Sequence, residues 1–137
     1  IKKNAELNNV ASKVVIRGFA DKYFYKDLKN DEIDQSVLLV DIEGAEFNLF
    51  DKNLFKKFSK SIIYIELHPW IFKNDGQEEL HKLENDAREY FTIEKITTTS
   101  RDLSKFEELK KWSDTDRWLI CSEGRHKLMT WWRLDPL

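Results

Sequence analysis

The chain has 137 residues, of which 41% are hydrophobic and 35% charged, and this balance predicts one soluble globular domain with a real core. The formal net charge of −2 excludes a bulk electrostatic attraction to nucleic acid, and no apolar run reaches the roughly 20 residues that span a bilayer. Ile1–Asn4 opens the chain without the hydrophobic segment of a signal peptide, and a single cysteine suits a reducing compartment, so a cytoplasmic protein is expected.

Hydrophobic patterning indicates that strands and helices alternate along the chain. In chain order we expect a short helix over 1–10, a strand over 13–19, one or two helical turns over 23–28, a strand over 37–42, a helix over 45–59, a strand over 62–67, a helix over 78–90, a strand over 91–97, an irregular helical turn over 101–112 and a strand over 117–122. This alternation is typical of an α/β fold, and we predict a single domain over 1–137 with a mostly parallel sheet.

One stretch in the first half of the chain organises the rest. Four aliphatic residues, 37–40, form a run too short for a helix, which indicates a strand buried on both faces. Asp41 and Glu43 follow two positions apart, so they point the same way from an extended chain. Gly44 permits a sharp turn, and Glu46 opens a helix whose dipole alone explains an acid there. Acids at the carboxyl end of a parallel strand are typical of ligand sites in α/β sheets.

The helix expected over 45–59 has one aromatic face. Lysines occupy the opposite face and cluster near the carboxyl end, where cations suit the helix dipole. The large apolar residues recur at three- and four-residue steps, which predicts a buried core face rather than a cofactor site: Phe47, Phe50, Leu54, Phe55 and Phe58.

A second buried strand, 62–67, also ends in polar groups. Glu66 and His68 lie on one face, and Pro69 then stops regular pairing. In a parallel sheet these two side chains would lie close to Asp41. Histidine is the side chain best suited to proton transfer near neutral pH, so we predict His68 as a base. The alternative is a histidine that is only hydrogen-bonded at a strand end.

Two motifs together resemble a known family. The string Asp41-Ile-Glu-Gly-Ala-Glu46 is followed by Ile65-Glu-Leu-His-Pro69, and this pair resembles the FkbM-like methyltransferases, a branch of the class I enzymes that use S-adenosylmethionine. Weaker agreement comes from Asn4-Ala-Glu-Leu-Asn8, from Gly18-Phe-Ala-Asp21 and from the tail. The resemblance implies a Rossmann-like sheet, S-adenosylmethionine as cofactor, and O-methylation of a saccharide or small hydroxylated molecule.

The resemblance also implies roles for individual residues. Asp41 would lie beside the methionine part and the reactive methyl group of the cofactor, as both a cofactor-binding and a catalytic residue. Asp21 would contact the adenine. Glu43 shares the direction of Asp41, and it either helps to bind the cofactor or is simply solvated. Glu66 and His68 would be the other catalytic residues. This interpretation assigns no metal ligand.

The glycine-rich turn that cradles the cofactor in this family has no counterpart in the sequence. The four glycines stand at 18, 44, 76 and 124, without a Gly-x-Gly cluster. We therefore expect a truncated domain, the carboxyl-terminal part of a methyltransferase without family strands 1 and 2. In the family's sheet order, 3-2-1-4-5-7-6, the strand over 37–42 corresponds to strand 4. It therefore loses its central neighbour when strands 1 and 2 are missing. Either strand 13–19 takes that place, giving the order 3-4-5-7-6, or a partner in a homodimer completes the sheet.

The residues leave two other functions open. Asp41, Glu43, Glu66 and His68 could bind Mg²⁺ or Mn²⁺ in a metal-dependent hydrolase or nuclease, although the sequence places no basic cluster beside them to hold phosphate. A chain without the glycine-rich turn could instead be a non-catalytic half-domain that dimerises. Cofactor binding distinguishes the methyltransferase from both alternatives, and metal-dependent activity without cofactor favours the hydrolase.

Overall fold

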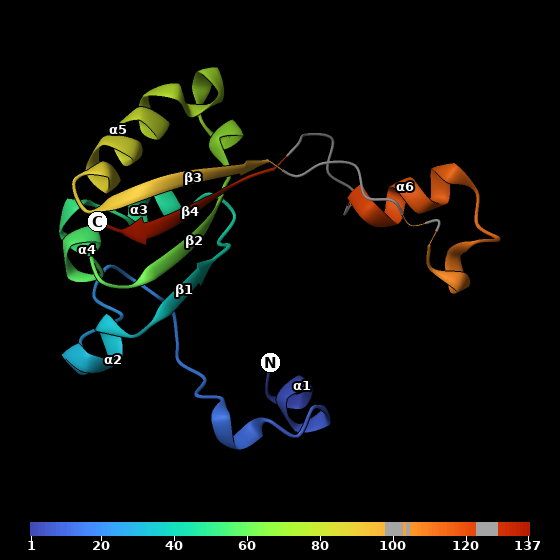
Figure 1. Ribbon diagram of the computed structural model, residues 1–137, viewed down its shortest axis with the longest axis horizontal. Helices are drawn as coiled ribbons and strands as arrows, with labels where there is room; N and C mark the ends of the chain where they lie inside the picture. The colour runs from blue at the N-terminus through green and yellow to red at the C-terminus, as the bar shows by residue number, and fades with distance from the viewer. Residues whose placement is uncertain (98–102, 104, 123–128) are drawn as a thin grey trace.

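The computed structural model describes residues 1–97, 103, 105–122 and 129–137, and a four-stranded sheet lies at its centre (Figure 1). The strands lie in the order β1-β2-β4-β3, with the bounds β1 (Val37–Val40), β2 (Ile62–Leu67), β3 (Phe91–Thr97) and β4 (Thr130–Pro136). Among these strands only β1 and β2 pair in parallel, because β4 inserts between β2 and β3 in the opposite direction. The fold is mixed α/β with an open sheet, but the prediction of a mostly parallel sheet is wrong.

The α-helices are short, and α5 is the longest of those described, with 12 residues. They are α1 (Lys2–Leu7), α2 (Asn30–Asp34), α3 (Glu46–Leu49), α4 (Lys52–Lys57), α5 (Gln77–Arg88) and α6 (Asp114–Ser122). Short 3₁₀ helices occur at Ala11–Lys13, Pro69–Ile71, Lys73–Gly76 and Glu107–Leu109. In the described ranges, no helix combines the length and the apolar character that crossing a bilayer requires.

The core lies between one face of the sheet and the helices α3, α4 and α5 (Figure 1). Alternate residues of β2, namely Ile63, Ile65 and Leu67, are buried on this face. Phe50 and Phe55 come from the helical side and stack with ring centroids 5.1 Å apart. The prediction that the aromatic stripe belongs to the core is confirmed.

The helix expected over 45–59 is in fact two helices, α3 and α4. Phe50 has an extended backbone, which ends α3. Asp51 then begins α4, because its side chain accepts a hydrogen bond of 2.8 Å from the Leu54 N–H. Aspartate is one of the strongest N-cap residues. The apolar spacing therefore identifies the buried residues correctly, while the cap decides where one helix stops and the next begins.

The segment 13–19 does not form the expected strand. Val15 is 78% exposed and Phe19 is 93% exposed, and no residue of the segment pairs with the sheet. Strand 13–19 therefore does not take the first place in the expected order 3-4-5-7-6. The remaining order, 4-5-7-6, is that of β1-β2-β4-β3, with β4 in the place of the strand expected over 117–122. β-branched residues favour a strand chiefly where they pack on a neighbouring strand, and the apolar run Val14–Ile16 is short.

Residues 117–122 belong to α6 and not to a core strand. Trp118 is 62% exposed. Ser113 Oγ accepts a hydrogen bond of 3.2 Å from the Asp116 N–H at the start of the helix, a capping contact that favours helix over strand. β4, which lies in the tail of the chain, joins the sheet instead, and its Trp132 is buried in the core.

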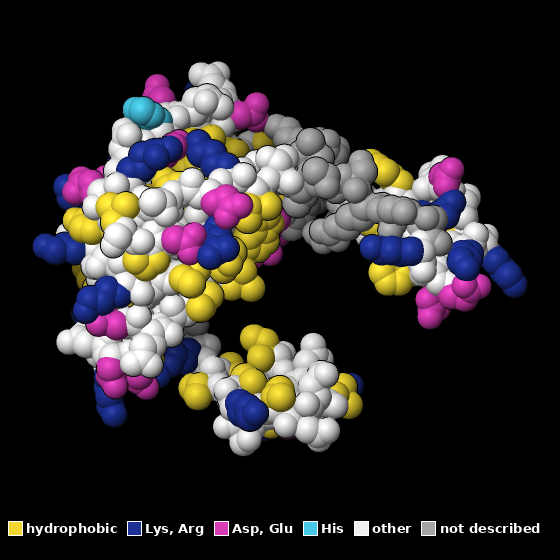
Figure 2. Space-filling model, in the orientation of Figure 1, with side chains coloured by type: hydrophobic (Ala, Val, Ile, Leu, Met, Phe, Trp, Pro, Cys, Tyr) yellow, Lys and Arg dark blue, Asp and Glu magenta, His cyan; other side chains and the backbone are white. Residues whose placement is uncertain are grey.

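β1 lies at an edge of the sheet. No described strand pairs with its outer side, and Val37 and Leu39 are 62% and 72% exposed on the face away from the core. Figure 2 shows hydrophobic side chains exposed in a patch over the strands. An apolar edge of this kind is able to pair with further backbone. Completion of the sheet by a homodimer partner stays a prediction.

Glu84 ties α5 to β3. Its carboxylate accepts hydrogen bonds from Lys95 Nζ at 2.8 Å and from Arg88 Nη2 at 2.6 Å. The hydrogen bond from Lys95 is the largest influence on the pKa of Glu84 and lowers it below 4.5, with Arg88 acting in the same direction and burial opposing both. Glu84 therefore stabilises the fold above its unfolded-state pKa, and this stabilisation is lost as the pH falls through the lower folded-state pKa.

Glu84→Gln is expected to lower the free energy of unfolding at pH 7 by about 1 kcal/mol or less, because the cationic partners are themselves half-exposed. The difference from the native chain should shrink as the pH falls below 4.5. Urea unfolding at neutral and acid pH measures this difference, with Glu6→Gln, at an exposed acid of α1, as the control. An equal loss at both pH values would show that the charge of Glu84 is not its cause.

Candidate active site at the strand ends

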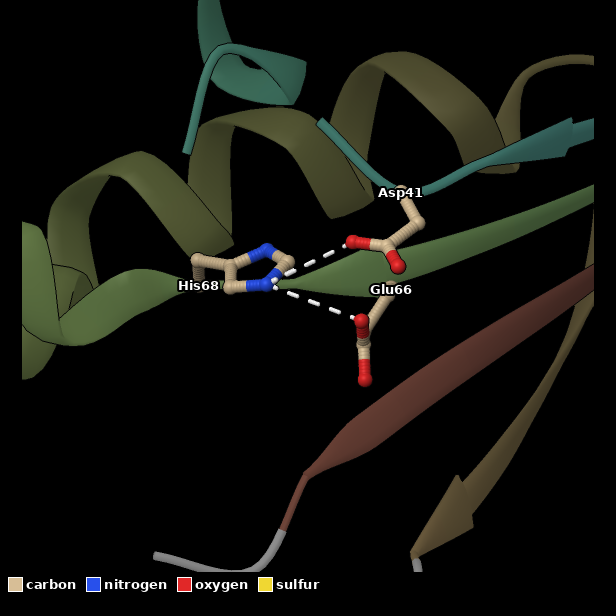
Figure 3. A group of neighbouring side chains, drawn as sticks. All are labelled: Asp41, Glu66 and His68. Atoms are coloured by element: carbon tan, nitrogen blue, oxygen red, sulfur yellow. Dashed lines mark ion pairs between the residues drawn. The ribbon is translucent and has the colours of Figure 1, made fainter. Parts of the chain in front are cut away.

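Three side chains meet where β1 and β2 end. Because these strands are parallel neighbours, their carboxyl ends lie at the same edge of the sheet. Asp41 follows β1, Glu66 lies in β2 and His68 comes just after it, and Figure 3 shows both carboxylates directed at the imidazole. His68 Nε2 is 3.7 Å from Asp41 Oδ1 and 3.6 Å from Glu66 Oε2. The structure thus brings together the three residues to which the sequence gives catalytic roles.

Glu46 holds the histidine from its other side. The Glu46 side chain is fully buried, and its Oε1 accepts a hydrogen bond of 2.7 Å from the His68 backbone N–H. The same oxygen lies 3.1 Å from His68 Nδ1, and Oε2 accepts a hydrogen bond of 2.8 Å from the Gly44 N–H. From the sequence alone, the helix dipole is a sufficient explanation for an acid at this position. Its four-residue spacing from the buried Phe50 is the signal that places it on the inner face of the chain.

The partners of His68 determine how its ring is used. The side chain is 1% exposed, and because a carboxylate can only accept, Nδ1 donates its hydrogen to Glu46. In the neutral ring, Nε2 then carries a lone pair. Within the described part of the chain Nε2 has no hydrogen-bond partner, although Glu43 Oε2 also lies 3.3 Å away. We refer to Asp41, Glu43, Glu46, Glu66 and His68 as the His68 cluster.

A family model described as the methyltransferase FkbM domain matches residues 8–112, a range that contains the whole His68 cluster. The chain belongs to the FkbM methyltransferase family. The resemblance carried by the two sequence motifs is thereby confirmed, and family membership indicates a methyltransferase. No curated protein and no solved structure matches the chain significantly.

A tight turn in this FkbM domain carries Glu43. Glu43 and Gly44 have successive φ angles of 52° and 101°, in the left-handed region that favours glycine. A Cβ at Gly44 would lie 2.4 Å from Ile71 Cδ1, so this position also leaves no room for a side chain. The side chains of Glu43 and Asp41 are 73% and 44% exposed. The His68 cluster is therefore closed on the β2 side and open to solvent on the β1 side.

The structure does not bring Asp21 to this FkbM site. Asp21 is exposed and precedes α2, and its Oδ1 accepts a hydrogen bond of 2.8 Å from the Tyr23 N–H. Across the described residues, no hydrogen bond or ion pair joins Asp21 to the His68 cluster. A contact between Asp21 and the adenine of a cofactor is thus supported by the sequence motif alone.

Proposed function

We propose that this FkbM domain transfers a methyl group from S-adenosylmethionine to a hydroxyl oxygen of a saccharide or another small hydroxylated molecule. One observation carries the proposal. The chain belongs to a methyltransferase family, and the buried imidazole of His68 has no hydrogen bond from Nε2 to the described residues. This nitrogen faces Asp41 and Glu43, whose side chains are open to solvent at the strand ends. Open α/β sheets bind their ligands at this edge.

The chemistry requires a proton acceptor beside the reacting oxygen. S-adenosylmethionine, when bound, supplies an electrophilic methyl group on a positively charged sulfur. The acceptor oxygen forms a bond to this methyl as the carbon–sulfur bond breaks, and the hydroxyl proton has to leave. His68 Nε2 takes the proton, because its lone pair is available while Nδ1 is held by Glu46. The products are a methyl ether and S-adenosylhomocysteine, and His68 returns its proton to solvent.

The acids of the His68 cluster stabilise the positive charge that the ring gains. Asp41 Oδ1 and Glu66 Oε2 lie 3.7 and 3.6 Å from Nε2, close enough for a direct charge interaction. Glu46 fixes the direction of the ring through Nδ1 and the His68 backbone N–H. A fixed base is one part of the orientation of reactants that supplies much of the acceleration in such a reaction.

Asp41 and Glu43 are the residues that fit the positively charged methionine end of the cofactor. Both lie on the solvent-open side of the His68 cluster, where their oxygens can accept hydrogen bonds from an ammonium group. Asp21 is the proposed contact for the adenine. The chain's four glycines form no Gly-x-Gly turn, so cofactor binding by this chain depends on the acids and not on a glycine-rich cradle.

Calorimetric titration of the purified chain with S-adenosylhomocysteine tests cofactor binding without an acceptor. We expect micromolar binding, and Asp41→Ala should weaken it by about 10- to 100-fold, the effect of losing a hydrogen bond to a charged group. Asp31→Ala, at an exposed acid of α2 that precedes β1, is the matched control and should bind as the native chain does. A folded native chain that binds no S-adenosylhomocysteine would favour the non-catalytic half-domain.

A further inference from the structure

We propose that the His68 cluster also binds one divalent cation, with His68 Nε2 and carboxylate oxygens of Asp41 and Glu66 as ligands. The site requires neither cofactor nor methyl acceptor, so it goes beyond the proposed methyl transfer. A group of acids alone would not indicate a cation. The buried histidine that points into this group does.

The surroundings of the His68 ring resemble those of a metal-binding histidine. Its side chain is 1% exposed, and Nε2, which has no hydrogen-bond partner among the described residues, points at the acids (Figure 3). A buried polar atom left without a partner destabilises the folded state, and a bound cation would remove that cost. On the other side of the ring, Nδ1 lies 3.1 Å from the Glu46 carboxylate. A carboxylate behind the ligating histidine commonly fixes its tautomer and direction in metal sites.

The separations between the ligand atoms suit a cation better than hydrogen bonds. Nε2 lies 3.7 Å from Asp41 Oδ1 and 3.6 Å from Glu66 Oε2, and both distances are too long for a hydrogen bond. One ligand atom from each of the three residues lies within 4.8 Å of the others. The ligands of a tetrahedral ion with bonds of about 2.1 Å are separated by about 3.5 Å. An ion between the three side chains would therefore reach bonding distance with little movement.

The ligand types select the class of ion. Two carboxylates and one imidazole suit a divalent transition ion such as Mn²⁺ or Zn²⁺, whereas Mg²⁺ and Ca²⁺ prefer oxygen ligands throughout. Glu43 Oε2, 3.3 Å from Nε2, is placed to act as a fourth ligand from the exposed side. The half-exposed Asp41 gives the ion a path from solvent.

The cation and the proton of a methyl acceptor would use the same lone pair of His68. A cation-bound Nε2 cannot take a proton, so bound Mn²⁺ should suppress a methyl transfer in which His68 is the base. Cation binding is therefore measured without S-adenosylmethionine and without acceptor. Methyl transfer is measured separately, by cofactor binding and turnover in metal-free buffer. A chain that fails to bind the cation is therefore distinguishable from a chain that fails to transfer a methyl group.

The test is a titration with MnCl₂ of the full chain, which is first treated with a chelator to remove bound metal. Calorimetry gives the affinity and stoichiometry, and the electron paramagnetic resonance signal of free Mn²⁺ counts the ions bound. We expect one ion per chain. Asp41→Asn should weaken binding at least about tenfold, and Asp31→Asn, the same change at an exposed acid of α2, should leave it unchanged.

Asp41 is chosen because its side chain is 44% exposed, so its substitution disturbs the fold less than substitution of the buried His68 or Glu66. Circular dichroism spectra verify that each variant is folded. A folded native chain that binds no Mn²⁺ would overturn the proposal. Equal affinities in Asp41→Asn and Asp31→Asn would overturn it as well, because the ion would then lie elsewhere.

Discussion

His68→Gln is expected to lower the rate of methyl transfer by about 100- to 10,000-fold, the usual contribution of a general base. Glutamine is able to donate a hydrogen bond to Glu46, but its amide cannot take a proton from the acceptor. Turnover is measured as S-adenosylhomocysteine formed with a panel of saccharide and small hydroxylated acceptors. The affinity for S-adenosylhomocysteine is measured in parallel by calorimetry.

The combination of the two measurements separates a base from a structural residue. A variant that has lost its base should turn over slowly while it binds S-adenosylhomocysteine as the native chain does. Glu46→Gln is the companion variant, because it retains the imidazole and weakens only its support, and we expect a smaller loss of rate. If a folded His68→Gln chain turns over at the native rate, the proton goes to another group.

Phe55→Ala is expected to reduce the free energy of unfolding by about 3–5 kcal/mol, the range for removal of a buried aromatic side chain. Phe55 is fully buried in α4. Its ring stacks on Phe50 at 5.1 Å and meets the edge of Phe91 in β3 at 6.0 Å, so it joins the helical layer to the sheet. Its loss would leave a cavity between the two layers. Urea unfolding at neutral pH measures the change.

Phe19→Ala is the matched control for this substitution. Phe19 is 93% exposed, so the same chemical change should alter stability by no more than about 0.5 kcal/mol. Comparable losses in the two variants would mean that Phe19 is buried against some part of the protein and that the core is not centred on Phe55.

The strand ends were the most predictable part of the molecule. The strand over 62–67 is found with the expected bounds, because a short apolar run between polar groups leaves little choice. Since β1 and β2 pair in parallel, Asp41, Glu66 and His68 meet as their positions in sequence suggest. The roles of these residues stay predictions, since geometry alone does not assign them.

The two wrong strand predictions, over 13–19 and over 117–122, have a common physical origin. The runs Val14–Ile16 and 118–120 both look like strands locally, but a strand forms only where a neighbour pairs with it. In the structure one run is exposed chain and the other is helical. The buried Glu46 was missed for a similar reason, because its partner His68 is brought to it by the pairing of β1 with β2.

Two of the five residues of the His68 cluster directly follow a strand that is paired on one side only among the described strands. Asp41 and Glu43 follow β1, which pairs with β2 alone among the described strands. Glu66 lies in β2 and His68 comes directly after it, and β2 is paired on both sides. An edge strand opens at lower cost than an interior one. The distance from the carboxylates of Asp41 and Glu43 to the imidazole of His68 should therefore fluctuate. A further segment of backbone paired with the outer edge of β1 would reduce this fluctuation. Loss of that segment should then lower the rate of the chemical step before it lowers the stability of the fold.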